Sequence, residues 1–186
     1  SVICSDKTGT LTQNKMTVVE NHTKDDKLLA KAMCLCTDAE VDEDIGEAVG
    51  EPTEAALVNY AYKINLNKNE LKKVAPRVGE APFDSMRKMM TTVHKKMDGK
   101  LVQFTKGAPD EVLKCCNRYL KDGEVLPLTE EAKEEILSAN KNMADRALRV
   151  LALGFKKLIT EPQEATSEAL EKELIFVGLV GMIDPV

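Results

Sequence analysis

Residues 87–106 read RKMMTTVHKKMDGKLVQFTK, which is the clearest structural signal in the chain. The first half, Arg87–Lys95, combines Met with β-branched residues, and the second half, Leu101–Lys106, again has strand composition. Between them lies Asp98-Gly99, a dipeptide that favours a tight turn because its residues tolerate a positive φ. The stretch therefore predicts an antiparallel β-hairpin.

On the C-terminal side of this hairpin, the sequence predicts further helices and strands. Gly107-Ala108-Pro109 would end the second strand and begin a helix, since Pro fits the first helical turn. Thr129 is a good N-cap, and the two glutamates after it suit the helix dipole. The expected elements are a helix to Cys115, a hairpin over Tyr119–Val125, a helix from Thr129 to Asp145, a strand over Arg149–Phe155, an irregular polar segment over Lys156–Glu173 and a strand over Leu174–Met182.

On the N-terminal side, the acidic stretch Asp38–Glu51 has two glycines and little periodicity, so a solvated loop is expected there. Helices and antiparallel strands are mixed without a regular βαβ rhythm, which predicts the α+β fold class. The expected elements on this side are strands at Ser1–Ser5 and Met16–Glu20 and helices at Lys27–Cys36, Thr53–Ile64 and Glu70–Ala75.

The composition excludes several classes of protein. The chain has 186 residues, with 26 basic and 31 acidic side chains and a net charge of −5. A general nucleic-acid or membrane-surface binder needs a dominating basic field, so neither is expected. The longest apolar run, Leu174–Ile183, is far shorter than the roughly 20 residues of a membrane-spanning helix. The five cysteines, an odd number, indicate reduced thiols.

A candidate catalytic segment follows the first expected strand. Asp6 would lie at the carboxyl end of that strand, where α/β sheets commonly house phosphoryl chemistry. An Asp carboxylate can attack phosphorus and form an aspartyl phosphate, while Lys7 offers a positive charge and Thr8 a hydroxyl for the transferred group. Haloacid-dehalogenase-type phosphatases usually have a second Asp at the position of Thr8. Without that carboxylate, an acyl phosphate on Asp6 is expected to persist longer.

Residues 6–12, DKTGTLT, resemble without a gap the phosphorylation motif of P-type cation-transporting ATPases. This resemblance implies that Asp6 is the phosphate acceptor, that Lys7 and Thr8 are catalytic, and that Asp6 and Thr8 hold Mg²⁺ in the full-length enzyme. It also implies a nucleotide-binding domain, built as a twisted antiparallel sheet flanked by helices, inserted in a haloacid-dehalogenase-like phosphorylation domain.

Four further stretches match the family in the family's order, and together they imply an ATP pocket. They are GEPTEAAL at 50–57, FDSMRK at 83–88, KGAP at 106–109 and LRVLA at 148–152. By resemblance, an acidic residue of the first stretch recognises adenine, the second supplies a stacking Phe and a Lys, and the last supplies a phosphate-facing Arg. The implied nucleotide-binding residues are Glu54, Phe83, Lys88, Lys106, Gly107 and Arg149.

The residues taken alone leave other roles open. Phe83 follows a Pro and is more typical of a core residue, whereas a platform for adenine needs an exposed ring. Glu54 could be a solvated first-turn residue favoured by the helix dipole, and Lys88 and Lys106 could be ordinary strand-end charges. Arg149 lies in an apolar strand, where a charge needs a partner, and this favours an anion.

Gly181–Pro185 resembles the family's return into the phosphorylation domain, with Asp184 as its carboxylate. The family usually has a second Pro where this chain has Val186. The predicted domains are 1–18 for the start of the phosphorylation domain, 19–173 for the nucleotide-binding domain and 174–186 for the return strand. Ser1–Ser5 and Leu174–Met182 are expected to lie close together, because an inserted domain leaves and re-enters its host at neighbouring points.

FDSMRKMM at 83–90 and KGAPDEVL at 106–113 look most like the type II pumps, especially the calcium-transporting branch. The implied function is that of an ATP-binding cytosolic domain of an integral membrane protein. Such a protein couples ATP hydrolysis, through an aspartyl phosphate, to cation transport, here calcium by resemblance. The implied partners are ATP and the remaining phosphorylation, actuator and transmembrane domains of the same polypeptide. The chain alone is expected to bind ATP without turnover.

Two alternatives belong to other functional classes. The first is a self-contained aspartate-dependent phosphatase of the haloacid-dehalogenase type, which would need an Asp at the position of Thr8. The second is a binding-only module that senses nucleotide and has lost catalysis, which the retained DKTGTLT motif disfavours.

Overall fold

The computed structural model describes residues 15–159 and 166–184, so the expected strand at Ser1–Ser5 lies outside the described residues. The elements in chain order are β1 (Thr17–Thr23), α2 (Asp26–Leu35), β2 (Glu40–Asp42), β3 (Glu47–Val49), α3 (Pro52–Tyr62), α4 (Lys68–Val74), β4 (Arg77–Asp84), β5 (Met89–Lys95), β6 (Leu101–Gly107), α5 (Pro109–Lys114), β7 (Cys116–Lys121), β8 (Glu124–Pro127), α6 (Glu130–Asp145), β9 (Arg149–Leu158), α7 (Ser167–Leu170) and β10 (Leu174–Ile183).

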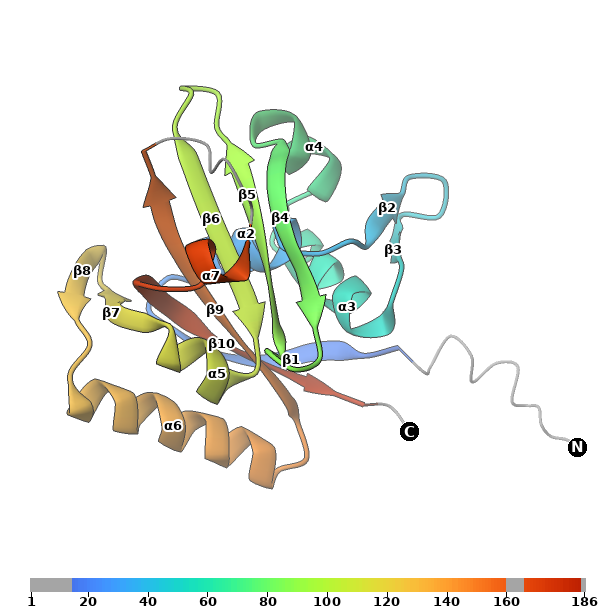
Figure 1. The fold of residues 1–186 in the computed structure, drawn as a ribbon. Coiled ribbons are helices and arrows are strands. Elements are labelled where there is room, and N and C mark those ends of the chain that lie inside the picture. Colours follow the sequence, from blue (N-terminus) through green and yellow to red (C-terminus); the bar gives the residue numbers. More distant parts are fainter. Residues whose placement is uncertain (1–14, 160–165, 185–186) are drawn as a thin grey trace, which may run out of the picture.

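The central sheet has the strand order β4-β5-β6-β9-β10-β7-β8, and β1 also pairs with β10 (Figure 1). The predicted hairpin is confirmed as β5 and β6, which pair antiparallel from Met89 opposite Gly107 to Lys95 opposite Leu101. Gly99 in the turn has a φ of 82°, the left-handed conformation that glycine adopts without strain.

The sheet is not antiparallel throughout, which corrects the sequence-based expectation. β10 runs parallel to β7, with Phe176 opposite Tyr119, whereas the other paired strands of this sheet are antiparallel. Parallel neighbours need a long crossover connection, and the chain passes through β8, α6, β9 and α7 before β10 returns beside β7. Helices and a large mixed sheet together give the α+β class.

β10 is an interior strand of the sheet. It is buried at every residue except Ile183, with β9 along one edge and with β7 and β1 sharing the other. This two-sided burial explains why its sequence is a continuous apolar run. The predicted domain boundary before Leu174 therefore falls inside the sheet, and the assignment of 174–186 to another domain stays a prediction about a longer protein.

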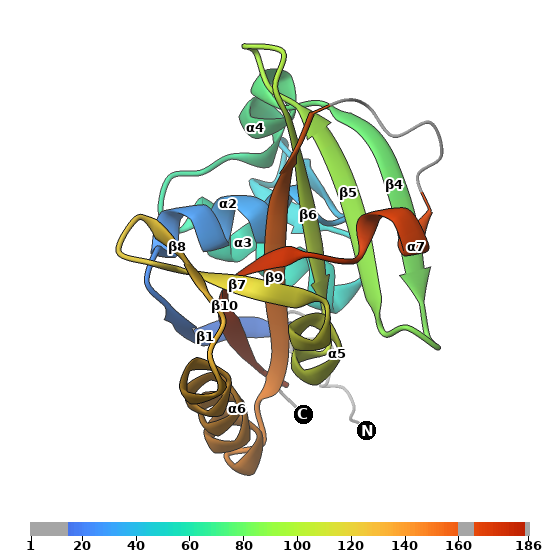
Figure 2. The same ribbon diagram turned by 60° about the vertical axis from the view of Figure 1, so that its left-hand side comes forward.

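Helices cover both faces of the sheet (Figure 2). α2, α3 and α4 pack on one face in a core cluster that includes Leu29, Leu57 and Met90. α5 and α6 pack on the other face in a second cluster that includes Val112 and Met89. Met89 and Met90 fall in different clusters because successive residues of a strand point to opposite faces.

The stretch Asp38–Glu51 was expected to be a solvated loop, but the structure shows regular secondary structure there. It contains the hairpin of β2 and β3, in which Val41 lies opposite Ala48. Both residues pack against the core cluster of α2 and α3, and Gly46 in the turn has a φ of 68°. Val41 and Ala48 alone give almost no periodic signal in this acidic stretch. Their packing is nevertheless enough to dock a short hairpin on the core.

The segment Lys156–Glu173 also differs from the irregular chain that was expected. β9 continues to Leu158, and α7 is the next element in the described part of the chain. The Thr166 hydroxyl caps the N-terminus of α7 by accepting a hydrogen bond from the Ala169 N–H. Leu170 at the end of α7 is 2% exposed. One buried leucine and one cap therefore define this short helix.

The described chain begins and ends at neighbouring points, since Thr17 of β1 lies opposite Ile183 of β10. Figure 1 shows these two strands side by side. Within 15–159 and 166–184, no helix has both the length and the apolar character needed to cross a membrane.

His94 in β5 is buried and uses both ring nitrogens. Its Nδ1 lies 2.9 Å from the carbonyl oxygen of Ala75, and its Nε2 lies 2.8 Å from the Thr92 hydroxyl. A carbonyl can only accept, so Nδ1 carries the proton and Nε2 accepts from Thr92. Burial in the core lowers the pKa of His94 to about 4.

Acidification should therefore destabilise the fold through His94. The unfolded chain takes up a proton on this residue near pH 6.5, whereas the folded chain does so near 4, because burial lowers the pKa of His94. The stabilising contribution is complete above pH 6.5 and is lost as the pH falls toward 4, by about 2 kcal/mol between pH 7 and pH 5. Urea unfolding at these two pH values should show this loss, and His94→Asn should lack it. An equal pH dependence in both proteins would contradict the assignment.

Candidate functional site

A cavity of about 530 Å³ lies at one end of the sheet, and the six residues that the sequence assigned to nucleotide binding all line it. They come from four segments that are far apart in the sequence. Glu54 lies at the start of α3, Phe83 and Lys88 lie at the β4–β5 connection, Lys106 and Gly107 end β6, and Arg149 begins β9.

The strand register explains why these segments meet. Met90 near the start of β5 lies opposite Lys106 at the end of β6, and Lys106 lies opposite Leu153 of β9. Because the three strands are antiparallel neighbours, the start of β5, the end of β6 and the start of β9 fall at the same end of the sheet.

Phe83 is exposed and is not a core residue. Its exposed fraction is 62%, and the β4–β5 register is irregular between Ala81 and Asp84, where a bulge can re-aim a side chain. Met90 and Leu151 line the same cavity. An exposed ring beside apolar side chains suits a flat aromatic ligand.

Glu54 and Lys106 form a largely buried ion pair inside the cavity. Lys106 Nζ lies 2.9 Å from Glu54 Oε2, and the two side chains are 7% and 16% exposed. Lys106 also donates to the carbonyl oxygen of Cys36 at 2.7 Å, and the Asp38 N–H donates to Glu54 Oε2 at 3.2 Å. Such a pair is stable only when further hydrogen bonds satisfy its charges. Glu54 is therefore not a solvated first-turn residue, and Lys106 is not an ordinary strand-end charge.

Lys88 owes its position to Gly107. Lys88 has a φ of 62°, which is unusual for a residue with a side chain, and its carbonyl oxygen accepts a hydrogen bond from the Ala108 N–H at 3.0 Å. A Cβ at Gly107 would lie only 2.3 Å from that carbonyl oxygen. The close approach of β6 to the Lys88 backbone therefore requires glycine.

Arg149 is exposed at the start of β9 and joins that strand to α3. Its Nη1 donates to the Thr53 hydroxyl at 3.2 Å. Among the residues that the structure describes, no carboxylate is within salt-bridge distance of Arg149 or Lys88. The cavity thus combines apolar side chains with the carboxylates of Asp38, Glu51 and Glu54 and with two cations available for an anion. Two of these carboxylates are already in ion pairs, Glu54 with Lys106 and Asp38 with Arg77.

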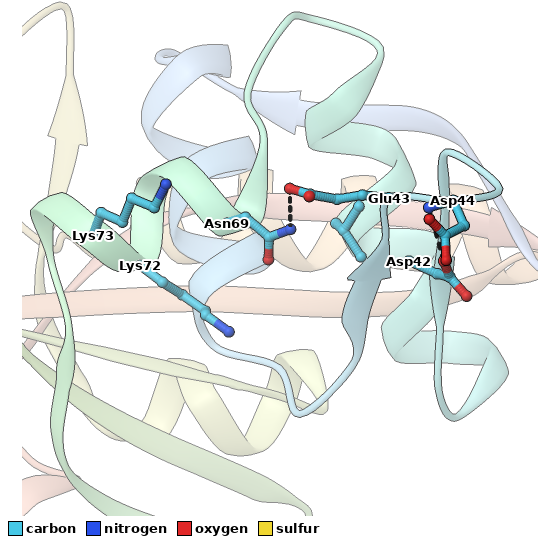
Figure 3. Close-up of a pocket in the computed structure, with 7 residues that line it drawn as sticks. Asp42, Glu43, Asp44, Asn69, Lys72 and Lys73 are labelled. Carbon is cyan, nitrogen blue, oxygen red and sulfur yellow. Dashed lines mark hydrogen bonds between the residues drawn. The ribbon is translucent and has the colours of Figure 1, made fainter.

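A second cavity, of about 700 Å³, has a different character. It lies between the β2–β3 turn and α4, and Figure 3 shows its acidic and basic side chains at opposite ends. Asn69 Nδ2 donates to Glu43 Oε1 at 3.0 Å across it. Val41 is its one apolar lining residue, so it offers no surface for a flat aromatic group.

Comparison with known proteins fits this geometry. The family model of the cytoplasmic domain N of P-type ATPases matches residues 26–186. The chain belongs to the P-type ATPase family. It is 42% identical over 198 residues to the calcium-transporting ATPase 1 of Lactococcus lactis, 44% over 199 residues to that of Bacillus cereus, and 40% over 201 residues to a calcium-transporting ATPase of Listeria monocytogenes. Each alignment covers 100% of this chain and 22% of the relative.

Of the other predicted site residues of this P-type ATPase chain, Asp184 does not line the cavity. Asp6, Lys7 and Thr8, including the two expected Mg²⁺ ligands, lie outside the described residues. Asp184 is exposed just after β10. It lies at the same end of the sheet as the cavity, because Met182 is opposite Arg149. Within the described ranges, no group of three or more His, Cys, Asp or Glu residues could hold a metal ion.

Several residues that line the P-type ATPase cavity were not predicted from the sequence, among them Asp38, Thr53, Met90 and Leu151. Thr53 and Leu151 lie inside stretches that match the family, so the motifs contained the signal. Asp38 belongs to the segment after α2 that was expected to be a loop, and no local pattern indicates that its N–H reaches Glu54.

Replacing Gly107 should disturb the site as well as the fold. In Gly107→Ala the new methyl group would meet the Lys88 carbonyl oxygen and the Met89 backbone, which cannot move without breaking the strand pairing. We expect a loss of about 2 kcal/mol or more in unfolding free energy, measured by urea denaturation. Gly154→Ala is the matched control on neighbouring β9, where a Cβ would meet nothing closer than 3.4 Å. Equal stability of the two variants would contradict the proposed close approach.

Proposed function

We infer that this chain is the ATP-binding domain of a calcium-transporting P-type ATPase. The observation that carries the proposal is the gathering of Glu54, Phe83, Lys88, Lys106, Gly107 and Arg149 around one cavity. These residues were assigned to one pocket from the sequence alone, and their convergence on one cavity supports a shared ligand. The family and the calcium-transporting relatives support ATP as that ligand and calcium as the transported ion.

The apolar part of the cavity suits adenine. Phe83 offers an exposed ring for stacking, and Met90 and Leu151 provide apolar contact. Base–aromatic stacking contributes roughly 1–3 kcal/mol. Glu54 Oε2 is occupied by Lys106 and by the Asp38 N–H, so Glu54 Oε1 is the oxygen proposed to accept a hydrogen bond from the adenine amino group.

The phosphates of ATP are proposed to lie toward Lys88 and Arg149, the two cavity cations without a carboxylate partner in the described part of the chain. Arg149 is at the same end of the sheet as the beginning of β1 and the end of β10. A terminal phosphate at this end would lie near the start of β1, and the segment that precedes β1 in the sequence contains the proposed acceptor Asp6. Mg²⁺, held by Asp6 and Thr8, would neutralise charge on the transferred phosphoryl group.

The proposal for the whole protein goes beyond this chain, which spans 22% of the length of the relatives above. In that protein the domain would lie in the cytosol beside the remaining phosphorylation, actuator and transmembrane domains. ATP hydrolysis through an aspartyl phosphate on Asp6 would drive calcium transport. Thr8, in place of a second Asp, argues against a haloacid-dehalogenase-type phosphatase.

Nucleotide binding can be tested by titrating the chain with ATP while following backbone amide shifts. We expect a dissociation constant on the order of 0.1–1 mM, with the largest shifts around the cavity. Phe83→Ala should weaken binding by roughly 1–3 kcal/mol, because it removes the stacking ring. Met86→Ala is the matched control, since Met86 is 88% exposed on the same β4–β5 connection and does not line the cavity. Equal affinity in the two variants would remove Phe83 from the site.

The aspartyl phosphate can be tested separately in a longer protein that contains this chain. Incubation with γ-labelled ATP and Mg²⁺, followed by an acid quench, should give an acid-stable label that hydroxylamine releases. The label should be absent in Asp6→Asn, because an amide cannot form the acyl phosphate. A label that persists in this variant would place the acceptor elsewhere.

A further inference from the structure

The short segment Cys36–Ala39, which follows α2, contacts both members of the ion pair in the cavity. The Cys36 carbonyl oxygen accepts a hydrogen bond from Lys106 at 2.7 Å, and the Asp38 N–H donates to Glu54 at 3.2 Å. The positions of Glu54 and Lys106 therefore depend on how this segment is held.

Lys68, at the start of α4, is one of the two residues that hold the segment. It is 2% exposed, and its ammonium group donates to the Thr37 carbonyl oxygen at 2.9 Å, to the Thr37 hydroxyl at 3.0 Å and to the Ala39 carbonyl oxygen. All three donors of the ammonium group are thus used. Burial lowers the pKa of Lys68, since desolvation disfavours the charged form. The three hydrogen bonds of this buried ammonium group order the backbone of Thr37 and Ala39.

Arg77, at the start of β4, holds the same segment from another side. Its Nη1 donates to Asp38 Oδ1 at 2.8 Å, and its Nη2 donates to the carbonyl oxygens of Leu35 and Thr37. The planar guanidinium thereby fixes both the side chain of Asp38 and the backbone on its N-terminal side.

These cations also complete the C-terminus of α2. The last carbonyl groups of a helix have no partner within the helix and carry a partial negative charge, and α2 has no basic residue in its last turn. Arg77 of β4 reaches the Leu35 carbonyl and Lys106 of β6 reaches the Cys36 carbonyl, while Lys68 of α4 adds its charge just beyond the helix at Thr37 and Ala39. Only Lys106 lines the nucleotide cavity, whereas Lys68 and Arg77 line a separate cavity of about 370 Å³.

We propose that Lys68 and Arg77 are positioning residues for the nucleotide site. By fixing Cys36–Ala39, they set the place of the Asp38 N–H and the Cys36 carbonyl, and these two groups orient Glu54 and Lys106 toward the base of the nucleotide. Lys68 and Arg77 do not touch the nucleotide. The proposal rests on the proposed function of the cavity, and it assigns to these two residues the selectivity for a 6-amino purine.

The test compares ATP with inosine triphosphate, which has an oxo group in place of the adenine amino group. In Lys68→Met the segment keeps only Arg77 of its two holding cations, so Glu54 is held less firmly and ATP should bind about fivefold more weakly. Inosine triphosphate, which lacks the amino group, should bind almost as before. The ratio of the two affinities is the readout, because a loss of folded protein would weaken both ligands equally. Lys73→Met is the matched control, since it removes an exposed lysine from the same helix.

A double-mutant cycle shows whether the effect passes through Glu54. In a Glu54→Ala background, Lys68→Met should change ATP affinity by no more than about twofold, because the oriented group is already absent. An additive loss in the double variant would overturn the proposal. So would an unchanged ratio of ATP to inosine triphosphate affinity in folded Lys68→Met.

Arg77→Met keeps the proposal testable if Lys68→Met does not fold. Arg77 is less buried than Lys68, and its loss should lower the same affinity ratio. A folded Arg77→Met with an unchanged ratio would overturn the proposal regardless of Lys68. If the unaltered chain bound no ATP, the proposed function itself would fail, and that result is distinguishable because it requires no variant.

Discussion

The ion pair between Lys106 and Glu54 is the contact on which the rest of the site depends. An ammonium and a carboxylate that are this little exposed need hydrogen bonds beyond their mutual attraction. The C-terminus of α2 provides them through the Cys36 carbonyl and the Asp38 N–H. The end of β6, the start of α3 and the end of α2 must therefore meet at one point. The cavity is the space that remains beside this meeting point, bordered by the β4–β5 connection and by β9.

The sheet places this cavity near the start of β1 and the end of β10, the first and last strands of the described chain. β10 is an interior strand, and it brings Ile183 beside Thr17 on one edge and Met182 beside Arg149 on the other. Arg149 is thus fixed beside β10, the last strand of the described chain. A ligand bound by Arg149 would be linked to the rest of a longer protein through a rigid strand. Such an arrangement suits a domain whose bound nucleotide must be presented to an acceptor outside it.

The parts of the fold that were predictable are those with local signals. The β5–β6 hairpin follows from Asp98-Gly99, and α6 follows from Thr129 at its N-cap. The β2–β3 hairpin and the parallel pairing of β10 with β7 depend on contacts distant in the sequence, which no local pattern encodes. For the site, the motifs named six residues that do line one cavity, while their roles stay predictions. The exposure of Phe83 ran against its local context, and the burial of Lys68 had no signal, because both result from tertiary packing.

The distribution of charge in the cavity argues for one orientation of the nucleotide. The charge of Lys106 is matched by Glu54, that of Asp38 by Arg77, and the Glu51 carboxylate accepts the Glu54 N–H at the N-terminus of α3. Lys88 and Arg149 have no comparable acidic partner in the described part of the chain. The carboxylates that line the cavity are thus ion-paired or hydrogen-bonded, whereas Lys88 and Arg149 carry positive charge that no described carboxylate pairs. A nucleotide in the proposed site would therefore direct its phosphates toward Lys88 and Arg149, with the terminal phosphate toward the point where β1 begins and β10 ends.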